Sequence, residues 1–171
     1  MKKDASRTFR VPLEAETYKE VQAVHQSNVS AEDRLRCTFQ TGDACCLVED
    51  FESGNLGHGQ FDAAVLANLL CRLPDPMACL DGLEACVAKN GVAVIVTPFS
   101  WLEQFTHKSK WLGGYEDPVS GTPIDSGDRL RVEMEARGFE QIHQEQMPLV
   151  IREHRRKYQY IVSEATGWRK K

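Results

Sequence analysis

Three stretches of the chain carry the hydrophobic patterns of β-strands. Residues 91–98 form the strongest apolar run, and residues 61–66 form a second run of the kind expected for a strand covered on both faces. Residues 35–41 alternate apolar and polar side chains, which predicts a third strand. The apolar run at 61–66 is followed by a polar residue, Asn68, which marks the expected end of that strand.

Helical spacing appears between and after these strands. Asp75 and Pro76 are typical of a helix start, and apolar residues at helical spacing continue from there to Asn90-Gly91. A second helix is predicted from Asp125 or Ser126 to Arg137. Residues 106–126 are rich in glycine and proline and indicate a long surface loop, which is usually a lid, a binding element or disordered.

The two ends of the chain complete the predicted order of elements. Residues 8–11 are interpreted as a short strand and residues 14–26 as a helix. Residues 139–147 and 157–166 are interpreted as two final strands with no helix between them. The alternation predicts an α/β sheet, parallel in its middle, with the last two strands as an antiparallel hairpin at one edge.

Composition narrows the classes of function. A length of 171 residues with 42% apolar composition suits one globular domain, and a net charge of −4 gives no general attraction to nucleic acid. The apolar runs are too short to span a membrane, and residues 1–10 lack a signal-peptide core, so we predict a cytoplasmic protein. The six cysteines include no Cys-x-x-Cys pair, which argues for packing and against a metal site.

Polar residues stand where the predicted strands end. Ligands of open α/β sheets bind at the carboxyl ends of the strands, and those ends carry Asp43, Asn68, and Pro98 with Phe99. We expect the Asp43 carboxylate to accept a hydrogen bond from an adenine amino group, and Asn68 with Leu69 to form the floor beneath a cofactor. The alternative is local, with Asp43 in a turn and Asn68 bonded only to its own backbone.

This order of motifs resembles class I S-adenosylmethionine-dependent methyltransferases. The matching stretches are Gly42-Asp43-Ala44, Phe61-Asp62, Leu73–Pro76 and Lys89–Val92. The resemblance implies a partial Rossmann-like sheet, mostly parallel with a C-terminal antiparallel hairpin. It also implies S-adenosylmethionine as the cofactor, bound by Asp43, Ala44, Asn68 and Leu69.

Four further stretches resemble the mercaptohistidine N-methyltransferase of ovothiol biosynthesis, from about Thr38 to the end of the chain. They are residues 67–76, 100–106, 110–114 and 151–159. This resemblance implies methylation of an imidazole nitrogen of mercaptohistidine. A neutral imidazole nitrogen already carries a lone pair, so the enzyme has mainly to align the reactants and exclude water.

The same resemblance suggests which residues handle the substrate. Arginine binds carboxylates through two parallel hydrogen bonds, which makes Arg152, Arg155 and Arg156 candidates for the amino-acid end of the substrate. His154 and Tyr158 are the candidate catalytic residues. An aromatic wall is expected from Trp101, Trp111 and Tyr115. The alternatives are a solvated charged face for residues 151–157 and buried packing for the two tryptophans.

The chain also departs from the family. No Gly-x-Gly precedes residue 42, so the glycine-rich cofactor loop and the first two strands of the family, roughly 60 residues, have no counterpart. We therefore divide the chain into an uncertain N-terminal segment, 1–34, and the C-terminal part of a methyltransferase domain, 35–171. Without the intervening strands, those at residues 35 and 61 would pair directly or leave open edges.

Two hypotheses follow, which differ in class. In the first, the chain methylates mercaptohistidine once a missing N-terminal segment or a partner such as the sulfoxide synthase completes it; the chain is then a fragment, a truncated gene model or one piece of a split protein. In the second, it is a non-catalytic methyltransferase-like fragment that binds a partner subunit. A third interpretation, a thiol redox or metal protein, rests only on the six cysteines.

Overall fold

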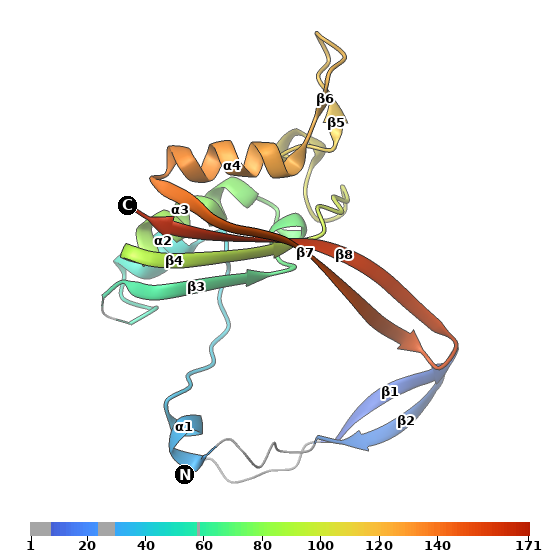
Figure 1. The fold of residues 1–171 in the computed structure, drawn as a ribbon. Helices are drawn as coiled ribbons and strands as arrows, with labels where there is room; N and C mark the ends of the chain where they lie inside the picture. The colour runs from blue at the N-terminus through green and yellow to red at the C-terminus, as the bar shows by residue number, and fades with distance from the viewer. Residues whose placement is uncertain (1–7, 24–29, 58) are drawn as a thin grey trace. The chain divides into compact units, whose positions relative to one another are not determined.

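A computed structural model describes residues 8–23, 30–57 and 59–171 (Figure 1). The chain divides into two compact units. The first contains residues up to 41 together with 150–161, and the second contains residues 42–149 and 162–171. The domain division predicted from the sequence, 1–34 and 35–171, follows the family resemblance, and it stays a prediction.

The first unit is built on an antiparallel hairpin. Strand β1 (Thr8–Glu14) pairs with strand β2 (Thr17–Gln22), and the Thr17 hydroxyl donates a hydrogen bond to the Glu14 carbonyl at 2.6 Å across the turn. The predicted strand at 8–11 is confirmed. The helix predicted at 14–26 is wrong for residues 17–22, because pairing with β1 overrides the helical spacing of their apolar side chains; residues 24–26 lie outside the described residues.

The strand predicted at residues 35–41 is also wrong. Helix α1 (Ala31–Leu35) ends there, and residues 37–43 have no regular structure. The Ser30 hydroxyl accepts a hydrogen bond from the Asp33 N–H at 3.0 Å, which favours a helix start. Leu35 is 73% exposed and Phe39 is 86% exposed. An alternating pattern becomes a strand only when a neighbouring strand pairs with it, and this segment has no such neighbour among the described residues.

The second unit holds a four-stranded sheet in the order β3-β4-β8-β7. Its strands are β3 (Phe61–Ala67), β4 (Val87–Thr97), β7 (Phe139–His154) and β8 (Lys157–Lys170), and the last two extend into the first unit. β3 and β4 are parallel, whereas β4 and β8 are antiparallel. A two-residue turn joins β7 to β8, so this pair is antiparallel as well.

The sheet is therefore mixed and mostly antiparallel, and the expectation of a mostly parallel sheet is not confirmed. The predicted C-terminal hairpin is present. The neighbouring strands β3 and β4 are joined through α3, which is the kind of connection that a parallel pair requires. Because β8 occupies the far edge of β4, it brings antiparallel pairing into the middle of the sheet.

The helices of this unit begin close to where the sequence predicts. α3 (Pro76–Cys86) starts after Asp75, whose carboxylate accepts a hydrogen bond from the Ala78 N–H, and α4 (Ser126–Ala136) starts after Asp125. A short helix, α2 (Leu47–Glu52), precedes β3. Between β4 and α4 the predicted loop contains a 3₁₀ turn (Lys108–Lys110) and the two-residue strands β5 (Tyr115–Glu116) and β6 (Pro123–Ile124).

The core lies between one face of the sheet and the helices α2, α3 and α4, which gather on that face (Figure 1). Leu66, Ile95 and Trp168 contribute from the strands, and Leu80 and Met134 contribute from the helices. On the opposite face of β3, Val65 is 67% exposed. The expectation that this strand is buried on both faces is wrong. No helix of the described residues is long and apolar enough to cross a membrane.

Candidate functional site

The carboxyl ends of β3 and β4 lie side by side, because Ala67 pairs with Val96 in the parallel register. The chain leaves both strands through left-handed backbone conformations, with φ of 52° at Asn68 and 48° at Phe99. Such conformations cost a non-glycine residue on the order of 1–3 kcal/mol and are concentrated at functional sites. These two strand ends therefore form the candidate site.

Asn68 connects the end of β3 to β4 and to the next strand of the sheet, β8. Its N–H donates to the Val96 carbonyl at 2.7 Å, and its side-chain oxygen accepts a hydrogen bond from the Ser163 hydroxyl at 2.9 Å. Ser163 belongs to β8 and is fully buried. The Asn68 side chain is thus not confined to its own backbone, and Leu69, which is 36% exposed, lies beside it in the chain.

Phe99 holds the equivalent place after β4. Its N–H donates to the Thr97 hydroxyl at 3.2 Å, and its carbonyl accepts from the Trp101 N–H at 2.9 Å. The ring is partly buried and packs against the core. Sequence reasoning placed Phe99 at a strand end, but it had no signal for the left-handed conformation, which phenylalanine rarely adopts.

Asp43 and Ala44 precede α2. One oxygen of the Asp43 carboxylate accepts a hydrogen bond from the Cys45 N–H at 2.9 Å, which is the local turn foreseen as an alternative. Ala44 packs against the core. The neighbouring Cys45 thiol donates to the Asp75 carbonyl at 3.4 Å, and its burial raises its pKa. The segment before α2 is therefore held against the start of α3, and an adenine contact by Asp43 stays a prediction.

The two tryptophans of the predicted aromatic wall are stacked, with ring centroids 6.5 Å apart. Trp101 is 8% exposed and its indole N–H donates to the Ser126 hydroxyl at 3.0 Å. The Trp111 indole N–H donates to the Thr106 carbonyl at 2.8 Å. This arrangement matches the packing alternative and fixes the loop after β4 to the start of α4. Tyr115 lines an open groove on β5.

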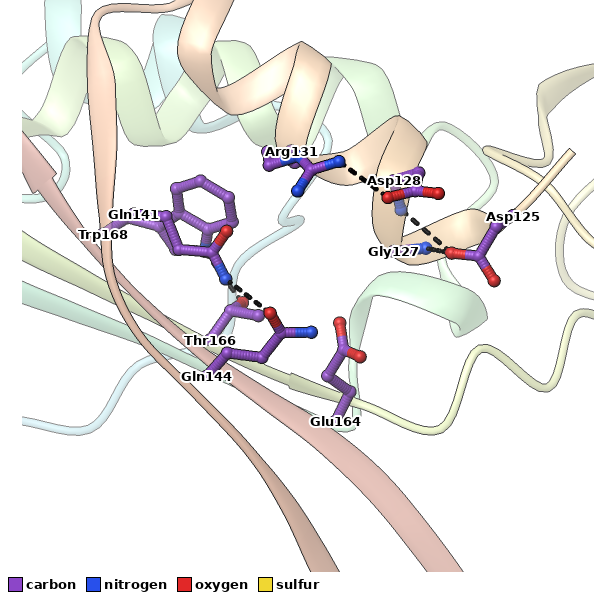
Figure 2. A pocket seen from close by; sticks show the side chains of 9 residues that line it. All are labelled: Asp125, Gly127, Asp128, Arg131, Gln141, Gln144, Glu164, Thr166 and Trp168. Carbon is purple, nitrogen blue, oxygen red and sulfur yellow. Dashed lines mark hydrogen bonds and ion pairs between the residues drawn. The ribbon is translucent and has the colours of Figure 1, made fainter.

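A polar cavity of about 100 Å³ opens between α4 and the strands β7 and β8 (Figure 2). Its lining is Asp125, Gly127, Asp128, Arg131, Gln141, Gln144, Glu164, Thr166 and Trp168. Glu164 pairs in register with Thr97, so the cavity adjoins the carboxyl end of β4. Sequence reasoning missed Glu164, because an isolated acidic residue in an alternating strand carries no motif.

The polar groups of this cavity hold one another in place. Asp125 accepts hydrogen bonds from the N–H groups of Gly127 and Asp128, at 2.8 and 2.9 Å, and Arg131 pairs with Asp128 at 2.8 Å (Figure 2). Gln146 donates to the Glu164 carboxylate at 3.3 Å. Three carboxylates against one guanidinium leave the lining acidic, which suits a cationic or hydrogen-bond-donating group.

The remaining predicted residues lie in the first unit, on the tip of the β7–β8 hairpin. The Arg155 guanidinium pairs with Glu14, and its N–H donates to the Leu13 carbonyl at 3.2 Å. His154 Nδ1 accepts a hydrogen bond from the Arg156 N–H at 3.2 Å. The structure thus divides the predicted residues between the two units, with Arg152, His154, Arg155 and Tyr158 in the first and Asp43, Ala44, Asn68, Leu69, Trp101 and Tyr115 in the second.

Comparison with protein families matches residues 7–144 to a family described as "Methyltransferase domain". Comparison with curated proteins gives no match. One similar solved structure comes from work on the conversion of a disulfide bond into a thioacetal group during echinomycin biosynthesis, with 14% identity over 77% of this chain and a TM-score of 0.48. Another is an S-adenosylmethionine-dependent methyltransferase from Methanosarcina mazei, with 17% identity over 66% of this chain and a TM-score of 0.45. The chain spans 55% of the length of the first of these structures and 60% of the second.

Proposed function

Because the chain belongs to the methyltransferase domain family, we propose that it takes part in S-adenosylmethionine-dependent N-methylation of the imidazole ring of mercaptohistidine, in ovothiol biosynthesis. Its fold is a class I methyltransferase-like α/β fold with a mixed sheet. The observation that carries the proposal is the pair of left-handed strand ends, Asn68 and Phe99, at the edge of the sheet where α/β proteins bind ligands.

The residues present fit one end of the cofactor. Leu69 offers a partly exposed apolar surface, and the amide of Asn68 is held in one orientation by Ser163. Asp43 uses one carboxylate oxygen for its own turn, and its other oxygen is the proposed acceptor for an adenine amino group. For the ribose and methionine ends we assign no residue. The fit is therefore to the adenine end alone.

Bound S-adenosylmethionine would supply a methyl group on its sulfonium sulfur, which would leave as a neutral thioether in an in-line displacement by the imidazole nitrogen. The chain's own contribution is to orient the imidazole nitrogen and keep water out. By resemblance to the mercaptohistidine enzyme, Trp101 and Tyr115 are assigned to the aromatic wall and Arg152 and Arg155 to the substrate carboxylate. His154 is assigned to accept the ring proton after transfer, and Tyr158 to donate a hydrogen bond. The resemblance of residues 100–106, 110–114 and 151–159 to the mercaptohistidine enzyme supports this assignment.

The first experiment is a calorimetric titration of the folded chain with S-adenosylmethionine, followed by mass spectrometry of mercaptohistidine incubated with both. Binding near one to one is the expected result for the chain alone. Gain of a methyl group on the ring is expected once a partner such as the sulfoxide synthase supplies the contacts to the ribose and methionine ends. The Asn68→Ala variant should bind about tenfold more weakly, because it loses the amide that Ser163 orients.

Ser126→Ala is the matched control for cofactor binding. It also removes one hydrogen-bonded polar side chain of the same unit, but its hydroxyl accepts from Trp101 at the start of α4, and Ser126 is not among the residues proposed to bind the adenine. Its affinity for S-adenosylmethionine should equal that of the unchanged chain. Folded chain that binds no cofactor would contradict the catalytic proposal for the chain alone.

A second candidate function is that of a non-catalytic methyltransferase-like domain that binds a partner. The specific observation in its favour is β3, an apolar strand at the edge of the sheet with Val65 67% exposed. Titration separates the two candidates: the non-catalytic domain gives no heat with S-adenosylmethionine at any concentration, yet associates with its partner. Methyl transfer by the isolated chain would contradict this second candidate.

A further inference from the structure

The polar cavity between α4 and the strands β7 and β8 carries both signs of charge. Figure 2 shows Arg131, on α4, and Glu164, on β8, facing the cavity from opposite sides. All of the lining residues belong to the second unit, so the cavity is a feature of that unit alone. None of them has a role in the proposed methyl transfer.

The Glu164 carboxylate offers one oxygen to a ligand. Gln146 donates to Oε2 at 3.3 Å, whereas Oε1 accepts no hydrogen bond within the described part of the chain. A Cβ on Gly127 would lie 2.9 Å from Oε1 of Glu164 and 3.2 Å from Oδ1 of Asp125. Because glycine has no side chain, the start of α4 leaves a hollow that Oε1 reaches. A carboxylate oxygen in such a hollow suits an ammonium group.

The Arg131 guanidinium offers hydrogen-bond donors to an anion. One of its N–H groups donates to Asp128 at 2.8 Å, and its other N–H groups have no partner among the residues that the structure describes. The two side chains of this ion pair are 51% and 71% exposed, and exposed pairs contribute little to stability. A ligand carboxylate can therefore bind Arg131 through two parallel hydrogen bonds.

A side-chain amide adds further donors, and the size of the cavity limits what enters. Gln141 donates to the side-chain oxygen of Gln144 at 3.1 Å, which leaves the NH₂ group of Gln144 to a ligand. A cavity of about 150 Å³ holds the six carbons of benzene, so one of about 100 Å³ holds roughly four to five non-hydrogen atoms. The head group of an α-amino acid, which is the ammonium nitrogen, the α-carbon and the carboxylate, has this size.

We propose that the polar cavity binds the zwitterionic head group of a free α-amino acid, with the ammonium on Glu164 and the carboxylate on Arg131 and Gln144. A simple cation would leave the donors of Arg131 and Gln144 unused, and a simple anion would be repelled by the three carboxylates of the lining. The inference requires neither S-adenosylmethionine nor Arg152 and Arg155, which the resemblance assigns to a substrate carboxylate in the first unit.

The test titrates the complete chain with L-histidine in the absence of S-adenosylmethionine. Two-dimensional NMR follows the backbone amide of Gly127 and the side-chain amide of Gln144, which both line the cavity. Histamine lacks the carboxylate of histidine, and imidazolepropionate lacks its ammonium. We expect saturable shifts with L-histidine, and binding weaker by about tenfold or more for each of the other two compounds, because each loses one charge-assisted contact.

Variants of the chain test the same contacts from the protein side. Glu164→Gln and Arg131→Gln should each weaken L-histidine binding by about tenfold or more. Gly127→Ala keeps both charges but fills the hollow, and it should weaken binding as well. Arg129→Gln is the matched control for the arginine, because it removes a similarly exposed, ion-paired guanidinium of the same helix. Glu140→Gln, on the exposed side of β7 and outside the lining, is the control for the glutamate.

The inference fails if L-histidine leaves the resonances of the cavity unshifted, or if Arg131→Gln binds it as tightly as the unchanged chain does. It also fails if histamine binds as tightly as L-histidine, because the acidic residues alone would then account for binding. If Glu164→Gln does not fold, Arg131→Gln decides, because its side chain is half exposed. Methyl transfer is measured separately, so a chain that binds the amino acid but no S-adenosylmethionine contradicts only the proposed function.

Discussion

Single residues determine how the chain leaves its strands. Four non-glycine residues among those described have positive φ. Two of them lie just after the strands: Asn68 follows β3 directly, and Phe99 is the second residue after β4. Asparagine tolerates this conformation, so the polar interruption at Asn68 was a readable sign of a strand end. Phe99 carried no such sign, because its conformation is imposed by Thr97, Trp101 and the core around its ring.

The carboxylate of Asp75 caps a helix and pairs with a lysine, and low pH should affect these two interactions differently. Its carboxylate caps α3 through the Ala78 N–H and pairs with Lys110 Nζ at 2.5 Å. The hydrogen bond from Lys110 lowers the pKa of Asp75, so the folded state favours the ionised form. Its contribution to stability is present above the ordinary carboxyl pKa of about 4 and is lost as pH falls through the lower folded value.

We expect Asp75→Asn to keep the cap, and its free energy of unfolding should fall less steeply below about pH 4 than that of the unchanged chain. Asp75→Ala should be less stable than Asp75→Asn by about 1 kcal/mol, because the cap is gone. Urea unfolding of both variants between acid and neutral pH measures this. Lys110→Gln is the control and should reproduce the flattening. An unchanged acid profile in Asp75→Asn would show that the pair with Lys110 contributes nothing.

At the scale of elements, the patterns at 61–66 and 91–98 predicted β3 and β4, and the capping residues predicted the starts of α3 and α4. The patterns at 14–26 and 35–41 predicted the wrong elements, although the spacing of their apolar residues was no less regular. Residues 17–22 found a partner in β1 and became a strand, whereas residues 37–43 found none. Short patterns of this kind are decided by pairing, which a single segment does not reveal.

The contact between α2 and α3 depends on one glycine. A Cβ on Gly82 would overlap the Cβ of Leu47 and lie 3.0 Å from its Cδ1, closer than carbon atoms pack. Gly82→Ala should therefore destabilise the fold by about 1–3 kcal/mol, although alanine is the better helix former by about 1 kcal/mol.

Thermal and urea unfolding measure this effect. Glu84→Ala, on the exposed side of the same helix, is the matched control and should change stability by less than about 0.5 kcal/mol. A stabilised Gly82→Ala protein would mean that α2 does not pack on α3 as described.

At the scale of the whole molecule, the order of strands in the mixed sheet predicts how strongly the amides of each strand are protected from hydrogen exchange. β4 lies between β3 and β8, while β3 has a neighbour on one side only among the described strands. We expect amide hydrogen exchange to be slowest in β4, fast in the β1–β2 hairpin, and alternating along β3. Asn68 directs its N–H toward Val96, so the amides of Ala63, Val65 and Ala67 point to the open edge.

Hydrogen–deuterium exchange measured by NMR resolves this alternation. The amide of Leu66, which points toward β4, is the internal control for those of Val65 and Ala67. Uniformly slow exchange along β3 would contradict the open edge and indicate that another segment pairs there.

The sequence by itself determined the two parallel strands, the two main helices, the C-terminal hairpin and the place of Asn68 at a strand end, because periodicity and capping act over a few residues. Tertiary structure alone decided that β8 inserts beside β4, that Glu164 adjoins a polar cavity, and that one face of β3 and β4 stays exposed. Each of these depends on which segments meet across long sequence separations. That choice is made by the burial of whole faces, and a local pattern specifies only which residues share a face.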